Sequence, residues 1–184
     1  MTEVPGGRTC DIISNLPGDV INVILMCLPL QDAVRTSVLS RKWRYNWAKL
    51  PKLTLDHTLW KETKQNIFHE VCCMLCLIRS SPNLEEIEIK AFNDEEEDLC
   101  AQEFLEAQYY ADIKLDRLRK IKLKQISGKM PEMKLIKLLL AKSPMLETML
   151  IEPCTKHIST QILIDMMKQV AKYERASPRA EVIF

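Results

Sequence analysis

The stretch LPGDVINVILMCLPLQDAVRTSVLSRKWRYNWAKL, Leu16–Leu50, carries an unusually high share of large apolar side chains. Two prolines divide it. Pro17 favours the first turn of a helix, where its missing N–H costs nothing. Pro29 ends that helix, because the residue before a proline avoids the α region. A second short helix is predicted over 31–39, so the stretch is expected to be helical and broken at fixed points.

A third helix is predicted after Ser40, which is a suitable N-cap, and it would carry Trp43 and Trp47. Three short helices in a stretch of this length cannot cover so much apolar surface, since domains below about 40 residues usually need outside help. The apolar side chains then either pack on the rest of this chain or also face another protein. The pattern alone favours the first interpretation, packing within the chain, without excluding the second.

Composition excludes several classes of protein. The 184 residues are 47% hydrophobic and 28% charged with a formal net charge of +1, so no global field attracts nucleic acid or a membrane. No apolar run reaches the length of a transmembrane helix, about 18 residues. Seven cysteines, an odd number, without a secretory signal predict reduced thiols in the cytosol or nucleus. Four glycines cannot form a phosphate-binding loop of the usual kinds.

A short pattern, L-x-x-φ-x-φ with φ an apolar residue, occurs four times from residue 50 onward. Its alternation is typical of a β-strand with one buried face. The pattern matches the strand of a leucine-rich repeat, although the starts lie 34, 34 and 28 residues apart, longer than the usual repeat of roughly 20–29 residues. The copies are Leu50/Leu53/Leu55, Leu84/Ile87/Ile89, Leu118/Ile121/Leu123 and Leu146/Met149/Ile151.

Aligning the copies by their first leucine predicts which residues of neighbouring strands lie side by side. Lys52–Glu86–Lys120 and Glu88–Lys122 would then be cross-strand pairs of opposite charge, each worth about 0.2–1 kcal/mol. Chance alternation in a chain rich in Lys and Glu gives a similar pattern, so the ladder supports the register without proving it. The two rows are Lys52, Glu86, Lys120 and Thr148, followed by Thr54, Glu88, Lys122 and Leu150.

Segments with a helical spacing of apolar residues lie between these strands, at 63–80, 130–143 and 159–174, the last with Ser159 as a possible cap. Alternation of strands and helices predicts an α/β fold with parallel strands and helices on one side. Such units cannot bury their faces singly, so they stack on their neighbours and need caps at the ends.

Residues 15–51 closely resemble the F-box of plant proteins that combine an F-box, leucine-rich repeats and a C-terminal FBD segment. The resemblance is carried above all by the Leu16-Pro17 pair, the Leu28-Pro29 pair, Val38-Leu39-Ser40 and Trp43-Arg44. In that family the F-box docks on the Skp-type adaptor of SCF ubiquitin ligases. The resemblance implies adaptor contacts at Leu16, Pro17, Ile21, Ile24, Leu28, Pro29, Val38, Leu39 and Trp43.

The segment 118–184 resembles the FBD region, through LRKIKL, LLLAKSPMLETMLI and the terminal ASPRAEVIF. Its last residues, 182–184, would form a strand that seals the end of the sheet. The expected organisation is an F-box at 11–50, a degenerate repeat region at 51–117 and the FBD segment at 118–184. The F-box would be three short helices, and a small leucine-rich-repeat-like α/β arc, capped by the FBD segment, would follow it. Most of the repeats that the family carries in the middle are absent, as in a shortened isoform, a pseudogene-like product or an incomplete gene model.

Three other features carry no predicted site. The acidic run 93–98 is expected to be a solvated loop. His69, Cys73 and Cys76 share one helical face, but a structural zinc site needs four ligands. These thiols and Cys72 are therefore expected to be buried and structural, and no metal or cofactor is predicted. The basic run at 114–129 lacks aromatic residues for stacking on bases, which argues against a nucleic-acid partner.

The predicted function is that of a non-catalytic substrate-recognition adaptor. The F-box would hold the Skp-type adaptor and, through it, a cullin scaffold, while the outward rows of the sheet would hold an unidentified protein substrate. Other subunits would perform the chemistry, which proximity accelerates. The alternative is a truncated competitor that occupies the adaptor without recruiting a substrate. The predicted substrate face comprises Lys52, Thr54, Glu86, Glu88, Lys120, Lys122 and Thr148.

Overall fold

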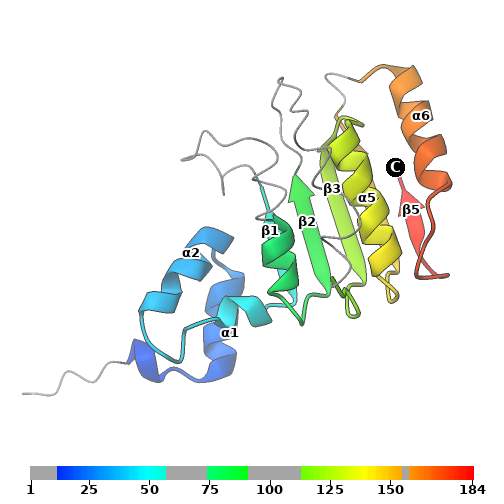
Figure 1. Ribbon diagram of the computed structural model, residues 1–184. Helices are drawn as coiled ribbons and strands as arrows, with labels where there is room; N and C mark the ends of the chain where they lie inside the picture. Colours follow the sequence, from blue (N-terminus) through cyan, green and yellow to red (C-terminus); the bar gives the residue numbers. More distant parts are fainter. Residues whose placement is uncertain (1–11, 57–73, 91–112, 155–157) are drawn as a thin grey trace, which may run out of the picture. The chain divides into compact units, whose positions relative to one another are not determined.

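The computed structural model describes residues 12–56, 74–90, 113–154 and 158–184. The chain divides into two compact units, Met1–Trp47 and Ala48–Phe184. Figure 1 shows that the first is helical and that the second is built on a β-sheet. The division follows the sequence closely, because the proline-punctuated apolar stretch ends where the first strand pattern begins.

Prolines precede both helices of the first unit, and the first helix ends before Pro29 as predicted. The second helix, predicted over 31–39, is α-helical only to Arg35. Pro17 and Pro29 occupy the N-cap positions, with φ of −56° and −55°. A proline suits this place because the first N–H groups of a helix have no partner within the helix. The elements are η1 (Ile13–Asn15), α1 (Gly18–Met26), α2 (Leu30–Arg35) and η2 (Thr36–Val38).

The predicted third α-helix is wrong. Turns occupy residues 41–45, and a 3-10 helix, η3, follows at Asn46–Lys49. The amides of Trp43 and Arg44 both donate to the carbonyl of Ser40, but Tyr45 has a left-handed φ of 62°, which stops the helix from continuing. The Ser40 hydroxyl is buried without a hydrogen-bond partner among the described residues, so it does not act as the predicted cap.

Five strands form one sheet in the second unit, in the order β1-β2-β3-β4-β5, and every neighbouring pair is parallel. The register confirms the rows predicted from the sequence. Lys52, Glu86, Lys120 and Thr148 are successive partners, as are Thr54, Glu88, Lys122 and Leu150. The strands are β1 (Lys52–Leu55), β2 (Glu86–Lys90), β3 (Lys120–Ile126), β4 (Thr148–Pro153) and β5 (Glu181–Ile183).

A tight turn precedes each of the last four strands, and the turns are joined to one another. The turns close through amide-to-carbonyl bonds of 3.1–3.3 Å: Leu84 to Ser81, Leu118 to Leu115, Leu146 to Ser143 and Ala180 to Ser177. The carbonyl of the residue just before each of the first four strands accepts one or two amides at the start of the next strand. The accepting carbonyls are those of Pro51, Glu85, Arg119 and Glu147. Each strand is thereby positioned by its predecessor.

The core of the second unit lies on one face of the sheet. The inward strand residues alternate with outward ones and are almost completely buried. Figure 1 shows the helical segment 74–79 and α5 (Met130–Lys142) lying against this face, and α6 (Thr160–Ala171) follows β4 in the chain. Successive parallel strands with right-handed crossovers place their helices on the same side. The inward residues are Leu53, Leu55, Ile87, Ile89, Ile121, Leu123, Met149 and Ile151.

The two described helices after β3 and β4 confirm the sequence prediction in their positions. On α6, Ser159 caps the helix by accepting the amide of Ile162, and Met166 and Val170 are buried as their spacing indicated. Ile162, by contrast, is 45% exposed, so the buried face of α6 is narrower than the periodicity suggested.

The connection from β3 to α5 is held by a carboxylate. Glu132 accepts hydrogen bonds from the Ser127 amide (2.9 Å), the Ser127 hydroxyl (3.0 Å) and the Lys129 amide (3.0 Å). Burial raises the pKa of Glu132, against the lowering effect of these bonds. Gly128, at φ 81°, allows the sharp turn that brings the donors together. The turn therefore fixes where α5 begins.

Candidate protein-binding surfaces

Helix α1 is apolar around most of its circumference. Ile21 and Leu25, four residues apart, point inward and are 0% and 1% exposed. Val20, Val23 and Met26, three residues apart, form a second stripe that is 42%, 61% and 58% exposed. A helix that is apolar nearly all round is normally buried. The described part of the chain covers only the stripe of Ile21 and Leu25. The other stripe (Val20, Val23 and Met26), here called the α1 stripe, is exposed and available to contact another surface.

The segment after α1 repeats this arrangement. Leu30 and Ala33 of α2 are buried, whereas Val34 is 36% exposed. Val38 and Leu39, at the end of η2, are 87% and 48% exposed. Val38 and Leu39, here called the η2 patch, are held outward by the tight turn, in which the Thr36 hydroxyl donates to the Ala33 carbonyl at 2.7 Å. Two apolar surfaces therefore arise from consecutive segments of the first unit.

Polar bonds hold the ends of this unit together. The Trp43 ring is 2% exposed, and its Nε1 donates to the carbonyl of Ile13 at 2.9 Å. The Lys42 ammonium group donates to the carbonyl of Leu16. The Asn46 side-chain amide donates to the Lys42 carbonyl at 2.6 Å. Together these bonds fix the Leu16-Pro17 corner, which precedes α1.

The nine residues predicted to contact an adaptor fall into three groups. Pro17, Pro29, Val38 and Leu39 are exposed; Leu16, Ile24 and Leu28 are half-buried; Ile21 and Trp43 lie in the core. Sequence reasoning did not single out Val20, Val23, Met26 and Val34, which are exposed. The signal was present, because a helical wheel of α1 shows apolar residues on both sides of its polar positions.

The second candidate surface is the outward face of the sheet. All seven residues predicted for a substrate face are exposed or half-buried and lie in the two paired rows. No helix among the described residues covers this face (Figure 1). The structure therefore brings these seven side chains together on one side of four neighbouring strands.

Ion pairs on this face differ in part from the predicted ladder. Lys52 and Glu86 form the expected pair, at 2.7 Å. Glu88 pairs with Lys124 rather than with its register partner, and Lys122 pairs with Glu152 at 3.2 Å. These pairs run diagonally because long side chains reach the neighbour two positions along the adjacent strand.

One of these diagonal pairs changes the acidity of both partners. The hydrogen bond from Lys124 lowers the pKa of Glu88, although partial burial acts in the opposite direction. The same bond raises the pKa of Lys124. Both effects favour the charged forms, so the pair is fully ionised at neutral pH.

The cysteine cluster and the acidic run lie largely outside the described residues. His69, Cys72, Cys73 and residues 93–98 belong to those parts of the chain. Cys76 is described and exposed, so the prediction of a buried thiol is wrong at this position. Within the described ranges, no three His, Cys, Asp or Glu side chains gather in a way that would hold a metal ion. The helices in those ranges are all too short or too polar to cross a membrane.

Comparison with known proteins identifies the first unit. Residues 13–55 match the family model of the F-box domain. Residues 13–55 are therefore an F-box domain, which contains the helices of the small apolar unit. F-box domains as a class bind Skp-type adaptors in SCF ubiquitin ligases. Its homologues in Arabidopsis thaliana are F-box/FBD/LRR-repeat proteins, which agrees with the resemblance read from the sequence.

Three of these relatives define how far the similarity reaches. One F-box/FBD/LRR-repeat protein is 30% identical over 122 residues, 66% of this chain and 28% of the relative. Two others are 52% identical over 50 residues and 46% identical over 59 residues, which cover 12% and 13% of those relatives. The chain thus spans less than a third of the length of the curated relatives it matches. No solved structure matches the chain.

Proposed function

We propose that this chain is a substrate-recognition subunit of an SCF-type ubiquitin ligase. The F-box binds a Skp-type adaptor and, through it, a cullin scaffold, and the outward face of the sheet binds a protein target. The chain itself contributes no chemistry, and it accelerates ubiquitin transfer by holding the target near the catalytic subunits. It acts in the cytosol or nucleus, where its thiols stay reduced.

The observation that carries the proposal is the exposed apolar surface of the F-box. Val23, Met26 and Val38 are each more than half exposed. They belong to a small unit, which needs its large apolar side chains to build a core. Covering a large aliphatic side chain contributes about 1.5–3 kcal/mol when burial is complete. Several such side chains supply enough free energy for a stable complex with a helical partner.

The proposal refines the roles of the nine contact residues. Ile21 and Trp43 support the surface from within, because their side chains have almost no exposed area. The other seven, joined by the α1 stripe and Val34, supply the contacts. Pro17 and Pro29 lie at the starts of the two helices, so they set the angle at which α1 and α2 present those contacts.

A pulldown of the full chain with a purified Skp-type adaptor tests the proposal. Val23→Asp places a charge in the α1 stripe, and we expect it to weaken binding more than tenfold, because burying an unpaired carboxylate is costly. Asn22→Asp adds the same charge to the neighbouring exposed position and is expected to leave binding nearly unchanged. Replacing both Leu16 and Pro17 by alanine should also weaken binding.

Failure of a correctly folded wild-type chain to bind any Skp-type adaptor overturns the proposal. Circular dichroism of each variant shows whether the helices are intact. Co-purification then separates a receptor from a competitor for the adaptor: a receptor retains a target protein at endogenous expression levels, and a competitor retains only ligase subunits.

A further inference from the structure

The outward positions of the five strands hold five lysines and four glutamates. Each carboxylate that β2 and β4 place on this face already has a lysine partner. The three ion pairs are Lys52–Glu86, Lys124–Glu88 and Lys122–Glu152.

Two lysines on the central strands are left over. Lys120 of β3 is exposed and Lys90 of β2 is half-buried, and neither forms an ion pair with a described residue. Lys90 lies directly beside Lys124 in the register, and like charges in that position are destabilising. Among the strand residues in the described ranges, Glu181 on the outermost strand β5 is the outward carboxylate without such a pair. The unmatched charge at the centre is thus cationic.

An apolar strip adjoins one of these lysines, Lys120. Lys120 neighbours Thr148, and one step further along the strands Leu150 neighbours Ile183. Leu150 is half-buried, and Ile183 is 40% exposed. The β4–β5 end of the face therefore offers aliphatic surface beside the cation of Lys120.

We propose that this face binds an extended acidic segment of the target, with an aliphatic side chain between its carboxylates. The proposal rests on the proposed function and names the chemistry of the substrate. The Cα atoms of Lys120 and Lys90 are four residues and one strand apart, roughly 14 Å at ordinary strand spacings. Two carboxylates four residues apart in an extended peptide match this separation. The position midway between them lies near Lys122, whose register partner on β4 is Leu150.

A nucleic acid fits the same face less well. The described outward positions of the five strands include no aromatic residue on which a base could stack. Glu86, Glu88 and Glu152 would repel a continuous phosphate backbone, whereas a peptide can place neutral residues opposite them. Charge complementarity therefore favours a protein segment with separated carboxylates.

Fluorescence polarisation on the full chain in complex with its adaptor tests this inference. The probes are three labelled decapeptides that carry Glu, Gln or Lys at two positions four residues apart, with leucine between them, and a ten-nucleotide oligothymidine. We expect the Glu peptide to bind at least threefold more tightly than the Gln peptide. The double variant Lys90→Ser/Lys120→Ser should abolish this preference, as should high salt.

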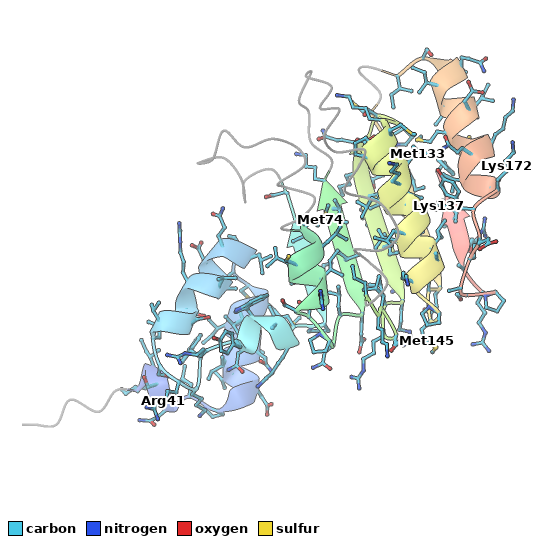
Figure 2. The ribbon with its side chains drawn as sticks, viewed as in Figure 1. Arg41, Met74, Met133, Lys137, Met145 and Lys172 are labelled. Atoms are coloured by element: carbon cyan, nitrogen blue, oxygen red, sulfur yellow. The ribbon has the colours of Figure 1, made fainter. Side chains whose placement is uncertain are left out.

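A matched control removes two lysines elsewhere. Lys137 and Lys172 are exposed and lie on and just after the helices of the covered face (Figure 2). Lys137→Ser/Lys172→Ser changes the net charge equally and should keep the preference for Glu. Equal loss in both double variants, equal binding of all peptides, tighter binding of the Lys peptide or of the oligonucleotide, or no binding of the Glu peptide overturns the inference.

Adaptor binding separates this inference from the proposed function. Both double variants should bind the Skp-type adaptor as the wild-type chain does, because their substitutions lie outside the F-box. Normal adaptor binding with no preference for acidic peptides contradicts only the inference. Loss of adaptor binding by the wild-type chain contradicts the proposed function.

Discussion

The indole nitrogen of Trp43 donates a 2.9 Å hydrogen bond to the carbonyl oxygen of Ile13, thirty residues earlier in the chain. The bond joins the turn before α1 to the segment that follows η2, and the ring fills the centre of the F-box. Trp43 therefore belongs to the core, although its place in the family motif suggested a contact with the partner.

Trp43→Phe should separate these two roles. The variant keeps an aromatic ring but loses the hydrogen bond, and we expect a loss of about 1–2 kcal/mol in the free energy of unfolding. Adaptor affinity, measured at a temperature where the variant is folded, should be almost unchanged. A drop in affinity without a drop in stability would show that Trp43 contacts the adaptor directly.

Ile21 and Val38 should respond in opposite ways to alanine. Ile21 is completely buried, so Ile21→Ala should cost about 2–5 kcal/mol of stability. Val38 is 87% exposed, so Val38→Ala should change stability by less than about 0.5 kcal/mol but weaken adaptor binding roughly 3–10-fold. Chemical denaturation and calorimetric titration measure the two quantities. Similar losses of stability in both variants would contradict the exposure of Val38.

Two serines at equivalent turns provide a matched pair. The Ser177 hydroxyl is buried and donates to the carbonyl of Leu146 at 2.6 Å, so Ser177→Ala should cost about 1–3 kcal/mol. The Ser143 hydroxyl is completely buried without a hydrogen-bond partner among the described residues. Ser143→Ala should therefore be neutral or stabilise the fold by up to about 1 kcal/mol. Thermal unfolding of the two variants checks the contrast, and a larger loss for Ser143→Ala would contradict it.

The Glu88 carboxylate should titrate below its ordinary pKa of 4.5, because Lys124 donates a hydrogen bond to it. A group with a lowered pKa stabilises the fold above its ordinary value, and this contribution is lost as the pH falls through the lowered one. NMR titration of the side-chain carboxyl measures the shift. Lys124→Met should bring the pKa of Glu88 upward, whereas Lys137→Met, on the covered face, should not.

Much of the sheet could be predicted from the sequence, because its signals are local and repeated. Aligning the copies by their first leucine predicts the register. In each strand, apolar residues alternate with mostly charged or polar ones, and this alternation predicts the buried face, which contains Leu53, Ile87, Ile121 and Met149. The diagonal ion pairs could not be predicted, since they depend on how Lys122 and Lys124 extend across the neighbouring strand.

The F-box shows a different limit. The prolines predicted both helices, but the left-handed backbone at Tyr45 leaves no trace in the sequence, so the third helix was wrong. The family motif named nine contact positions without distinguishing a core residue such as Ile21 from an exposed one such as Val38. That distinction requires the exposure of each side chain, as does the recognition of the α1 stripe.

The chain of turn-to-turn bonds through Pro51, Glu85, Arg119 and Glu147 has an evolutionary consequence. Because each link involves only adjacent strands, duplicating one strand–helix module would disturb a single junction and leave every other backbone partner in place. Gain or loss of modules can therefore change the width of the sheet stepwise, while the F-box stays untouched.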